Sequence, residues 1–233
     1  MLASGPHVPG RHDLRVLDLR VLDLRGPDLR GPDHAAWQRL CGRAAGLEGE
    51  ADRVAREVIA AVREHGDAAV TALTARHEGR DLREFELSAE HRSIAAARVP
   101  AALREALALA AANIRAFHET QLVGDTGLHG EAIQLTSRAR PLARVAVYAP
   151  GGTAAYPSSV LMAAIPAKVA GVRELILLTP RPSDVVLCAA ELADVDRVFA
   201  IGGAQAIAAA ALGTAQIPRV DKIVGPGNAY VTA

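Results

Sequence analysis

The hydrophobic positions between residues 34 and 130 recur mainly with the spacing of helices. In residues 50–64 the apolar side chains fall on one helical stripe, formed by Val54, Val58, Ile59 and Val62. Gly66 ends this helix, and Asp67 can cap a second one that runs to Leu73. This part of the chain is therefore predicted to be a helical N-terminal region.

Two more helices and one short strand complete that region. Residues 85–87 alternate as a strand does. Ser88 is a plausible N-cap for a helix over 89–98, because its hydroxyl can accept a bond from a free backbone N–H. Pro100 suits the first turn of a longer helix that runs to about Thr120.

Beyond residue 130 short apolar runs alternate with helical segments. After an extended stretch at 132–139, strands are expected at 145–148, 175–178, 198–201 and 222–224, with helices at 158–170, 185–192 and 204–212. This order predicts an α/β fold with a parallel sheet and helices on its faces, a Rossmann-like region over 131–233. The fold alone predicts no particular chemistry.

The first 33 residues follow another pattern. Asp-Leu-Arg recurs with a period of five, starting at Asp13, Asp18, Asp23 and Asp28. A period of five matches neither a helix face nor a strand face, and two Gly-Pro pairs interrupt any regular element. Residues 1–33 are expected to be a disordered low-complexity tail; a binding tail is the functional alternative.

Composition narrows the class of protein. Lysine plus arginine and aspartate plus glutamate each number 26, so no charge excess favours nucleic acid or an anionic membrane. The two cysteines, Cys41 and Cys188, do not make a disulfide framework. No apolar segment follows a basic start, and the longest apolar stretch, 201–215, is too short to span a bilayer. A soluble cytoplasmic enzyme is expected.

Glycine follows three of the predicted strands. Gly151 and Gly152 follow the first, Gly202 and Gly203 the third, and Gly225 and Gly227 the fourth. Glycine leaves backbone N–H groups open to a ligand, and the C-terminal rim of a parallel sheet is where such folds bind ligands. None of the three turns is a P-loop or a dinucleotide fingerprint. One such turn alone indicates tight packing, whereas three that carry Tyr148, Gln205 and Asn228 indicate a cleft.

The stretch from Arg140 to Thr232 resembles histidinol dehydrogenase. Four segments carry the resemblance: YAPGGTAAYPSSVLM at 148–162, IPAKVAGV at 165–172, GGAQAIAA at 202–209 and PRVDKIVGPGN at 218–228. The likeness is dense over about ninety residues and extends more weakly back to about residue 50. One departure is Ala146, where the family usually has glycine.

The resemblance implies an enzyme that oxidises L-histidinol to L-histidine in two steps with two NAD and a bound zinc, at the end of histidine biosynthesis. It implies an aldehyde-dehydrogenase-like sheet with NAD bound in a non-standard way, and a homodimer for the complete enzyme. Tyr148, Gln205 and Asn228 fall on family positions that contact NAD. A tyrosine ring can pack on the adenosine or ribose, and the two amides can both donate and accept hydrogen bonds. Lys168 and Lys222 are expected to be surface or packing residues.

The family's zinc ligands and general base cannot be assigned in this sequence. All eight histidines precede residue 130, at His7, His12, His34, His65, His77, His91, His118 and His129. None shows the ligand spacing of a helical zinc motif, and the helical ones are expected on solvated surfaces. In the family the catalytic groups follow the Gly-Pro-Gly-Asn turn at 225–228, so no catalytic or metal residue is predicted here. The sequence is expected to be an inactive N-terminal fragment.

Two alternatives remain open. The chain can be a different NAD enzyme related to aldehyde dehydrogenases, which would need a nucleophilic cysteine near the cleft; Cys188 is the only cysteine in the α/β region. Its apolar position within a predicted helix argues against that role. The other alternative is a non-catalytic NAD-binding or interaction module that kept this fold and lost the chemistry.

Overall fold

The computed structural model describes residues 48–130, 132–151 and 156–233. The described residues belong to one compact unit. The predicted tail at 1–33, together with Cys41, lies outside the described residues, as do Gly152 and Thr153 of the first glycine turn.

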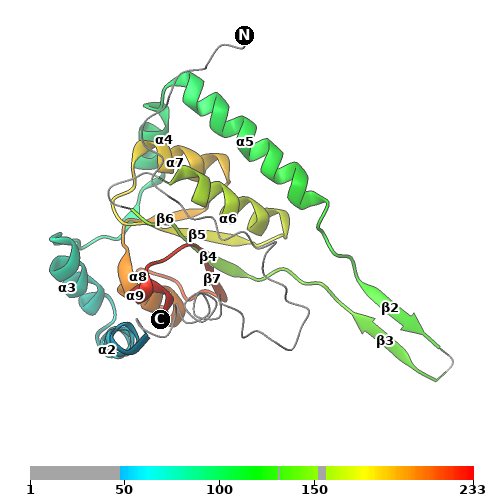
Figure 1. Cartoon of the computed structure of the whole chain (residues 1–233), viewed down its shortest axis with the longest axis horizontal. Helices are drawn as coiled ribbons and strands as arrows, with labels where there is room; N and C mark the ends of the chain where they lie inside the picture. Colours follow the sequence, from blue (N-terminus) through cyan, green and yellow to red (C-terminus); the bar gives the residue numbers. More distant parts are fainter. Residues whose placement is uncertain (1–47, 131, 152–155) are drawn as a thin grey trace, which may run out of the picture. The chain divides into compact units, whose positions relative to one another are not determined.

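A five-stranded sheet forms the centre of this unit (Figure 1). Its strand order is β1-β6-β5-β4-β7. The strands are β1 Glu86–Leu87, β4 Arg144–Tyr148, β5 Glu174–Leu178, β6 Arg197–Phe199 and β7 Lys222–Val224. β4 to β7 are mutually parallel, which confirms the predicted parallel α/β sheet. β1 is the exception, because it pairs antiparallel with β6 at one edge.

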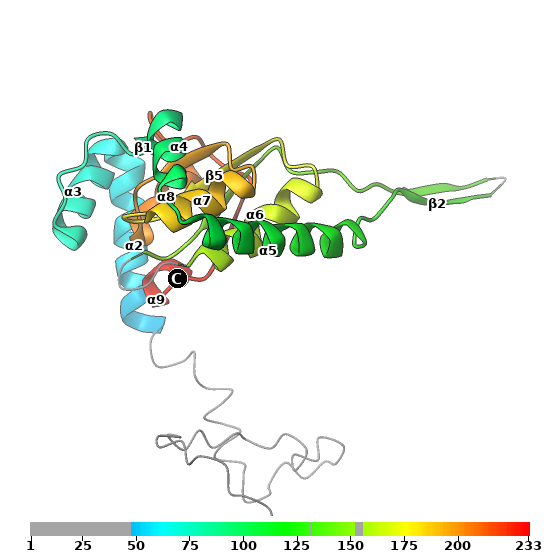
Figure 2. The same ribbon diagram turned by 90° about the horizontal axis from the view of Figure 1, so that it is seen from above.

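Helices cover both faces of this sheet (Figures 1 and 2). One face carries α4 Ala89–Ala97, α5 Ala101–Glu119, α6 Pro157–Val169 and α7 Asp184–Leu192. The other carries α2 Glu48–His65, α3 Asp67–Glu78, α8 Gly203–Leu212 and the short α9 Ala229–Thr232. None of the described helices has both the length and the hydropathy needed to cross a membrane.

The alternation of side chains along β4 separates the two hydrophobic cores. Val145 and Val147 pack with α5, α6 and α7, whereas Ala146 and Tyr148 pack with α2, α3 and α8. Successive strand residues point to opposite faces, so this division follows from the strand itself. Tyr148 is thereby directed to the same side of the sheet as α8.

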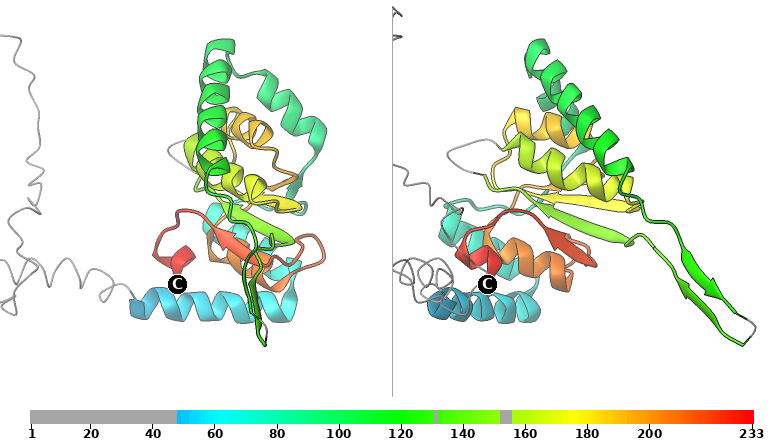
Figure 3. Two further views of the ribbon diagram at one scale, coloured as in Figure 1. Left: turned by 90° about the vertical axis from the view of Figure 1, so that its right-hand side faces the viewer. Right: turned by 45° about the vertical axis from the view of Figure 1, so that its right-hand side comes forward.

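A separate hairpin extends from the end of α5 (Figure 3). It consists of β2 Thr126–His129 and β3 Gln134–Ser137, which pair antiparallel with Leu128 opposite Leu135. The extended stretch predicted at 132–139 contains β3, but helical periodicity gave no sign of β2. The pairing that defines β2 is made with a strand later in the chain, and every residue of both strands is exposed.

The structure corrects one predicted helix start and confirms another. Asp67 does not cap α3: its N-cap is Gly66, and the Asp67 carboxylate instead accepts a bond from the backbone N–H of Gln216 at 3.1 Å. α3 also continues to Glu78, past the predicted end at Leu73. The Ser88 hydroxyl does cap α4, accepting a bond from the N–H of His91 at 3.1 Å.

The glycines after the strands allow neighbouring loops to lie in direct contact. A Cβ on Gly151 would overlap the carbonyl of Pro180, and one on Gly202 would lie 2.6 Å from the Pro180 ring. Gly225 has a φ of +142°, and a Cβ there would overlap the carbonyl of Tyr148. Side chains rarely adopt such a φ, so this position requires glycine for both its conformation and its neighbours.

Replacing Gly225 with alanine is therefore expected to lower the free energy of unfolding by about 1–3 kcal/mol, because the strand-end loops must move apart. Urea denaturation followed by circular dichroism measures the change. Gly124→Ala is the matched control, since a Cβ at Gly124 meets no atom within 4 Å. Equal stability of the two variants would contradict this account of the loop packing.

Candidate functional site

A cavity of about 490 Å³ opens where the parallel strands end. In the order β6-β5-β4-β7 the chain moves outward in one direction from β4 to β6 and then returns to the other side of β4 for β7. Ligands of open α/β sheets bind at this kind of reversal, outside the carboxyl ends of the strands. The cavity is lined by Val54, Val58, His77, Glu78, Tyr148, Gly151, Pro180, Gly203, Ala204, Gln205, Asn228 and Tyr230.

The structure brings together the three side chains that the sequence singled out. Tyr148 is the last residue of β4, Gln205 lies in the first turn of α8, and Asn228 precedes α9. All three line this one cavity, although up to 80 positions separate them in the sequence. The strand ends place them there because β4, β6 and β7 run in the same direction.

Tyr148 is buried and fixed by one hydrogen bond. Its hydroxyl accepts a bond from the N–H of Gly203 at 3.3 Å, at the start of α8. Burial raises the pKa of the hydroxyl, the Gly203 bond opposes that rise, and the nearby charge of Glu78 adds to it. The phenol is thus neutral at physiological pH. Tyr148 lines the cavity, and its hydroxyl can still donate its hydrogen to a ligand.

Gln205 presents an amide at the N-terminal end of α8. The residue is only 3% exposed, and its amide makes no hydrogen bond to any of the described residues. Gly203, with a φ of +68°, leaves the space that the amide occupies, because a Cβ there would lie 2.6 Å from its Oε1. The N-terminus of a helix carries partial positive charge, so this end of the cavity suits anionic and hydrogen-bonding ligand groups.

Asn228 has a structural bond as well as a place at the cavity. Its Oδ1 accepts a bond from the backbone N–H of Val231 at 3.1 Å and caps α9. The side-chain amide keeps its two N–H donors, and the residue is exposed. Asn228 can therefore donate to a ligand at the cavity rim while α9 holds its carbonyl group in place.

Sequence reasoning missed the wall that α2 and α3 supply. His77, expected on a solvated surface, is exposed but lines the cavity together with Glu78. Glu78 pairs with Arg80 at 2.6 Å, and Arg80 also donates to the carbonyl of Ala200 at 2.7 Å. Arg181, in the loop after β5, donates to the main-chain carbonyl of Glu78. Nothing in the spacing of these residues signals the contact, since it arises from packing across more than 100 positions.

The other candidate groups lie elsewhere. Lys168 pairs with Asp196 at 2.6 Å and Lys222 lines a different groove, so neither faces the cavity. Cys188 is fully buried in α7, and burial raises the pKa of its thiol, which disfavours the reactive thiolate. Within the described ranges no group of three or more histidine, cysteine, aspartate or glutamate side chains could hold a metal ion.

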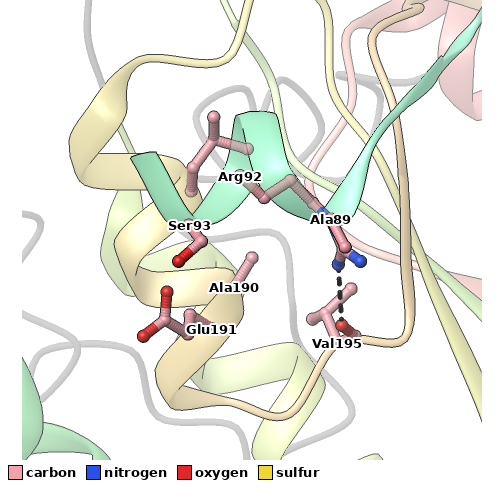
Figure 4. A pocket seen from close by; sticks show the side chains of 7 residues that line it. Ala89, Arg92, Ser93, Ala190, Glu191 and Val195 are labelled. Atoms are coloured by element: carbon pink, nitrogen blue, oxygen red, sulfur yellow. Dashed lines mark hydrogen bonds between the residues drawn. The ribbon is translucent and has the colours of Figure 1, made fainter. Parts of the chain in front are cut away.

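A second, smaller cavity of about 260 Å³ lies between α4 and α7 (Figure 4). The figure shows Arg92 bonded to the carbonyl of Val195, a contact of 3.1 Å, and Arg92 also donates to the carbonyl of Asp196 at 3.1 Å. These carbonyls precede β6, at the opposite end of the strand from the first cavity. Arg92 thus holds α4 to a loop. The cavity at the strand ends is the better candidate, because Tyr148, Gln205 and Asn228 all line it.

Comparison with known proteins agrees with the motifs. The sequence profile described as histidinol dehydrogenase matches residues 43–233. The histidinol dehydrogenase of Nitrosomonas europaea is 48% identical over 195 residues, which cover 80% of this chain and 45% of that protein. The Bordetella parapertussis enzyme is 52% identical over 191 residues, 78% of this chain and 43% of that protein.

A solved structure has the same fold. The crystal structure of histidinol dehydrogenase from Elizabethkingia anophelis superposes with a TM-score of 0.74 at 33% identity, over 78% of this chain and 43% of that one. The chain thus spans less than half the length of the relatives it matches. Since the profile covers most of the sequence and the identities reach about half, the chain belongs to the histidinol dehydrogenase family.

Proposed function

We propose that the cavity at the strand ends binds NAD and that the chain provides the cofactor side of a histidinol dehydrogenase. The complete enzyme would oxidise L-histidinol to L-histidine through histidinal, in two successive oxidations. The observation that carries this proposal is the convergence of Tyr148, Gln205 and Asn228 on one cavity at the reversal of strand order. An aldehyde-dehydrogenase-like arrangement of the sheet belongs to the same proposal.

Each group has a task suited to its chemistry. The ring of Tyr148 offers a buried flat surface for an adenosine or ribose, and its hydroxyl can donate. The amides of Gln205 and Asn228 can bond to hydroxyls or phosphate oxygens, near the positive end of α8. NAD, when bound, accepts the hydride that leaves the substrate carbon in each oxidation. The cavity residues orient it and exclude water from one side of it.

Zinc does not fit the described residues. The family's reaction needs a metal to hold the alcohol and a base to remove its hydroxyl proton, and the described side chains form no cluster that could ligate a metal. L-Histidinol as substrate, zinc as cofactor, a homodimeric assembly and a cytoplasmic location are proposals for the complete enzyme.

The structure argues against one of the two alternative functions and is compatible with the other. A cysteine-dependent dehydrogenase is disfavoured because Cys188 is buried in α7 and does not line the cavity. A non-catalytic NAD-binding module would use the same cavity. It differs from the proposed enzyme in having no catalytic half, so NAD binding alone does not separate the two.

The cofactor proposal predicts that Gln205→Ala weakens NAD binding. Losing one hydrogen bond to the ligand costs about 1 kcal/mol, which raises the dissociation constant about fivefold. Isothermal titration calorimetry of the 233-residue chain with NAD measures this. Gln134→Ala, on the exposed strand β3, is the control and should leave binding unchanged. Identical NAD affinity for both variants would show that Gln205 does not contact the cofactor.

The fragment proposal predicts that this chain alone does not oxidise histidinol. The assay follows NADH absorbance with purified chain, NAD, histidinol and zinc. We expect no turnover above the rate without protein, because the described residues include no group of three or more side chains that could bind a metal ion. In a positive control, the C-terminal half of a relative is added as a separate polypeptide, and NADH formation is expected. Turnover by the chain alone, approaching that of a full-length relative, would overturn this placement of the catalytic groups.

A further inference from the structure

The cavity wall contains one carboxylate whose hydrogen bonding is incomplete. Glu78, the last residue of α3, lines the cavity and its side chain is 15% exposed. Its Oε2 accepts bonds from Arg80 at 2.6 and 3.1 Å. Its Oε1 is buried and has no hydrogen-bond partner among the described residues. A buried carboxylate oxygen without a donor is unfavourable, so a donor from a bound ligand would complete this site.

The cations near Glu78 are already engaged. Arg80 is held by the Glu78 carboxylate and by the carbonyl of Ala200. Arg181 donates to the main-chain carbonyl of Glu78. Neither arginine lines the cavity, whereas Glu78 does. This part of the wall therefore offers a ligand an acceptor with negative charge, while the two arginines are not among the residues that line the cavity.

Glu78 also lies close to the proposed cofactor groups. Its charge acts on Tyr148, where it adds to the rise in the pKa of the hydroxyl that burial causes. Both residues line the cavity, and they come from different elements, Tyr148 from β4 and Glu78 from α3. The terminal torsion of a glutamate turns easily, so either oxygen can meet a hydroxyl that enters between them.

We propose that Glu78 selects NAD over NADP, by accepting a hydrogen bond from a free ribose hydroxyl and repelling a phosphate in its place. This inference rests on the proposed cofactor site. An acidic side chain that binds the ribose hydroxyls is a general way to recognise NAD, and an arginine at that place accommodates the additional phosphate of NADP. Glu78 and Arg80 are adjacent in space, so removing the negative charge of Glu78 would free a guanidinium for that phosphate.

The test is a calorimetric titration of the full chain with NAD and, separately, with NADP. The unchanged chain should bind NAD at least tenfold more tightly than NADP. Glu78→Gln should bind NAD more weakly and NADP more tightly, so that the ratio falls at least tenfold. Glu78→Asp keeps the charge and should still reject NADP. Glu64→Gln, at a side chain 75% exposed on α2, makes the same chemical change away from the cavity and should alter neither affinity.

The outcomes separate this inference from the site on which it rests. If the unchanged chain binds NAD and Glu78→Gln has the same ratio of NAD affinity to NADP affinity, the selectivity inference is wrong and the cofactor site stands. If the chain binds neither nucleotide, both are wrong. Thermal unfolding of each variant is measured in parallel. If Glu78→Gln does not fold, Glu78→Asp still tests the inference, because NADP binding as tight as NAD binding by this charged variant would contradict it.

Discussion

The close contact between loops at the C-terminal end of the sheet is the constraint on which the cavity depends. Gly151 and Gly202 both face Pro180, and Gly225 faces the main chain of Tyr148. A side chain at any of these three positions would separate loops that follow different strands. Glycine at these positions leaves backbone N–H groups open to a ligand. The structure gives them another role as well, since they let four strand ends meet around one cavity.

Tertiary packing on one face of the sheet completes that cavity. Tyr148 points toward the face of the sheet that α2, α3 and α8 cover. Residues of α2 and α3 therefore form a second wall of the cavity. Arg80 and Arg181 fasten the end of α3 to the loops after β6 and β5 through main-chain carbonyls. These bonds hold Glu78 at the cavity without any contribution from the strand-end motifs. The polar lining is thus built from two distant parts of the sequence.

The sequence was most informative where a local pattern decides the structure. The alternation of short apolar runs with helical segments predicted the four parallel strands. The glycine turns after three of these strands predicted that Tyr148, Gln205 and Asn228 lie near one another. The short strand predicted at 85–87 is present as β1, but its antiparallel pairing with β6 depends on a partner more than 100 positions away, which periodicity does not report. The hairpin strand β2 was not predicted, because it is defined by pairing with a strand later in the chain. Asp67 has the residue type of a helix cap, but a long-range bond to Gln216 uses its carboxylate. His77 and Glu78 look like ordinary helix-surface residues until α3 is placed on the sheet.

The proposed function requires that a dinucleotide occupy the cavity at the ends of the parallel strands. A crystal structure of the chain grown with NAD tests it most directly. We expect electron density for NAD against the ring of Tyr148, with polar atoms of the ligand within hydrogen-bond distance of Gln205 and Asn228. Density for NAD at another place on the protein, with this cavity filled only by solvent, would contradict it.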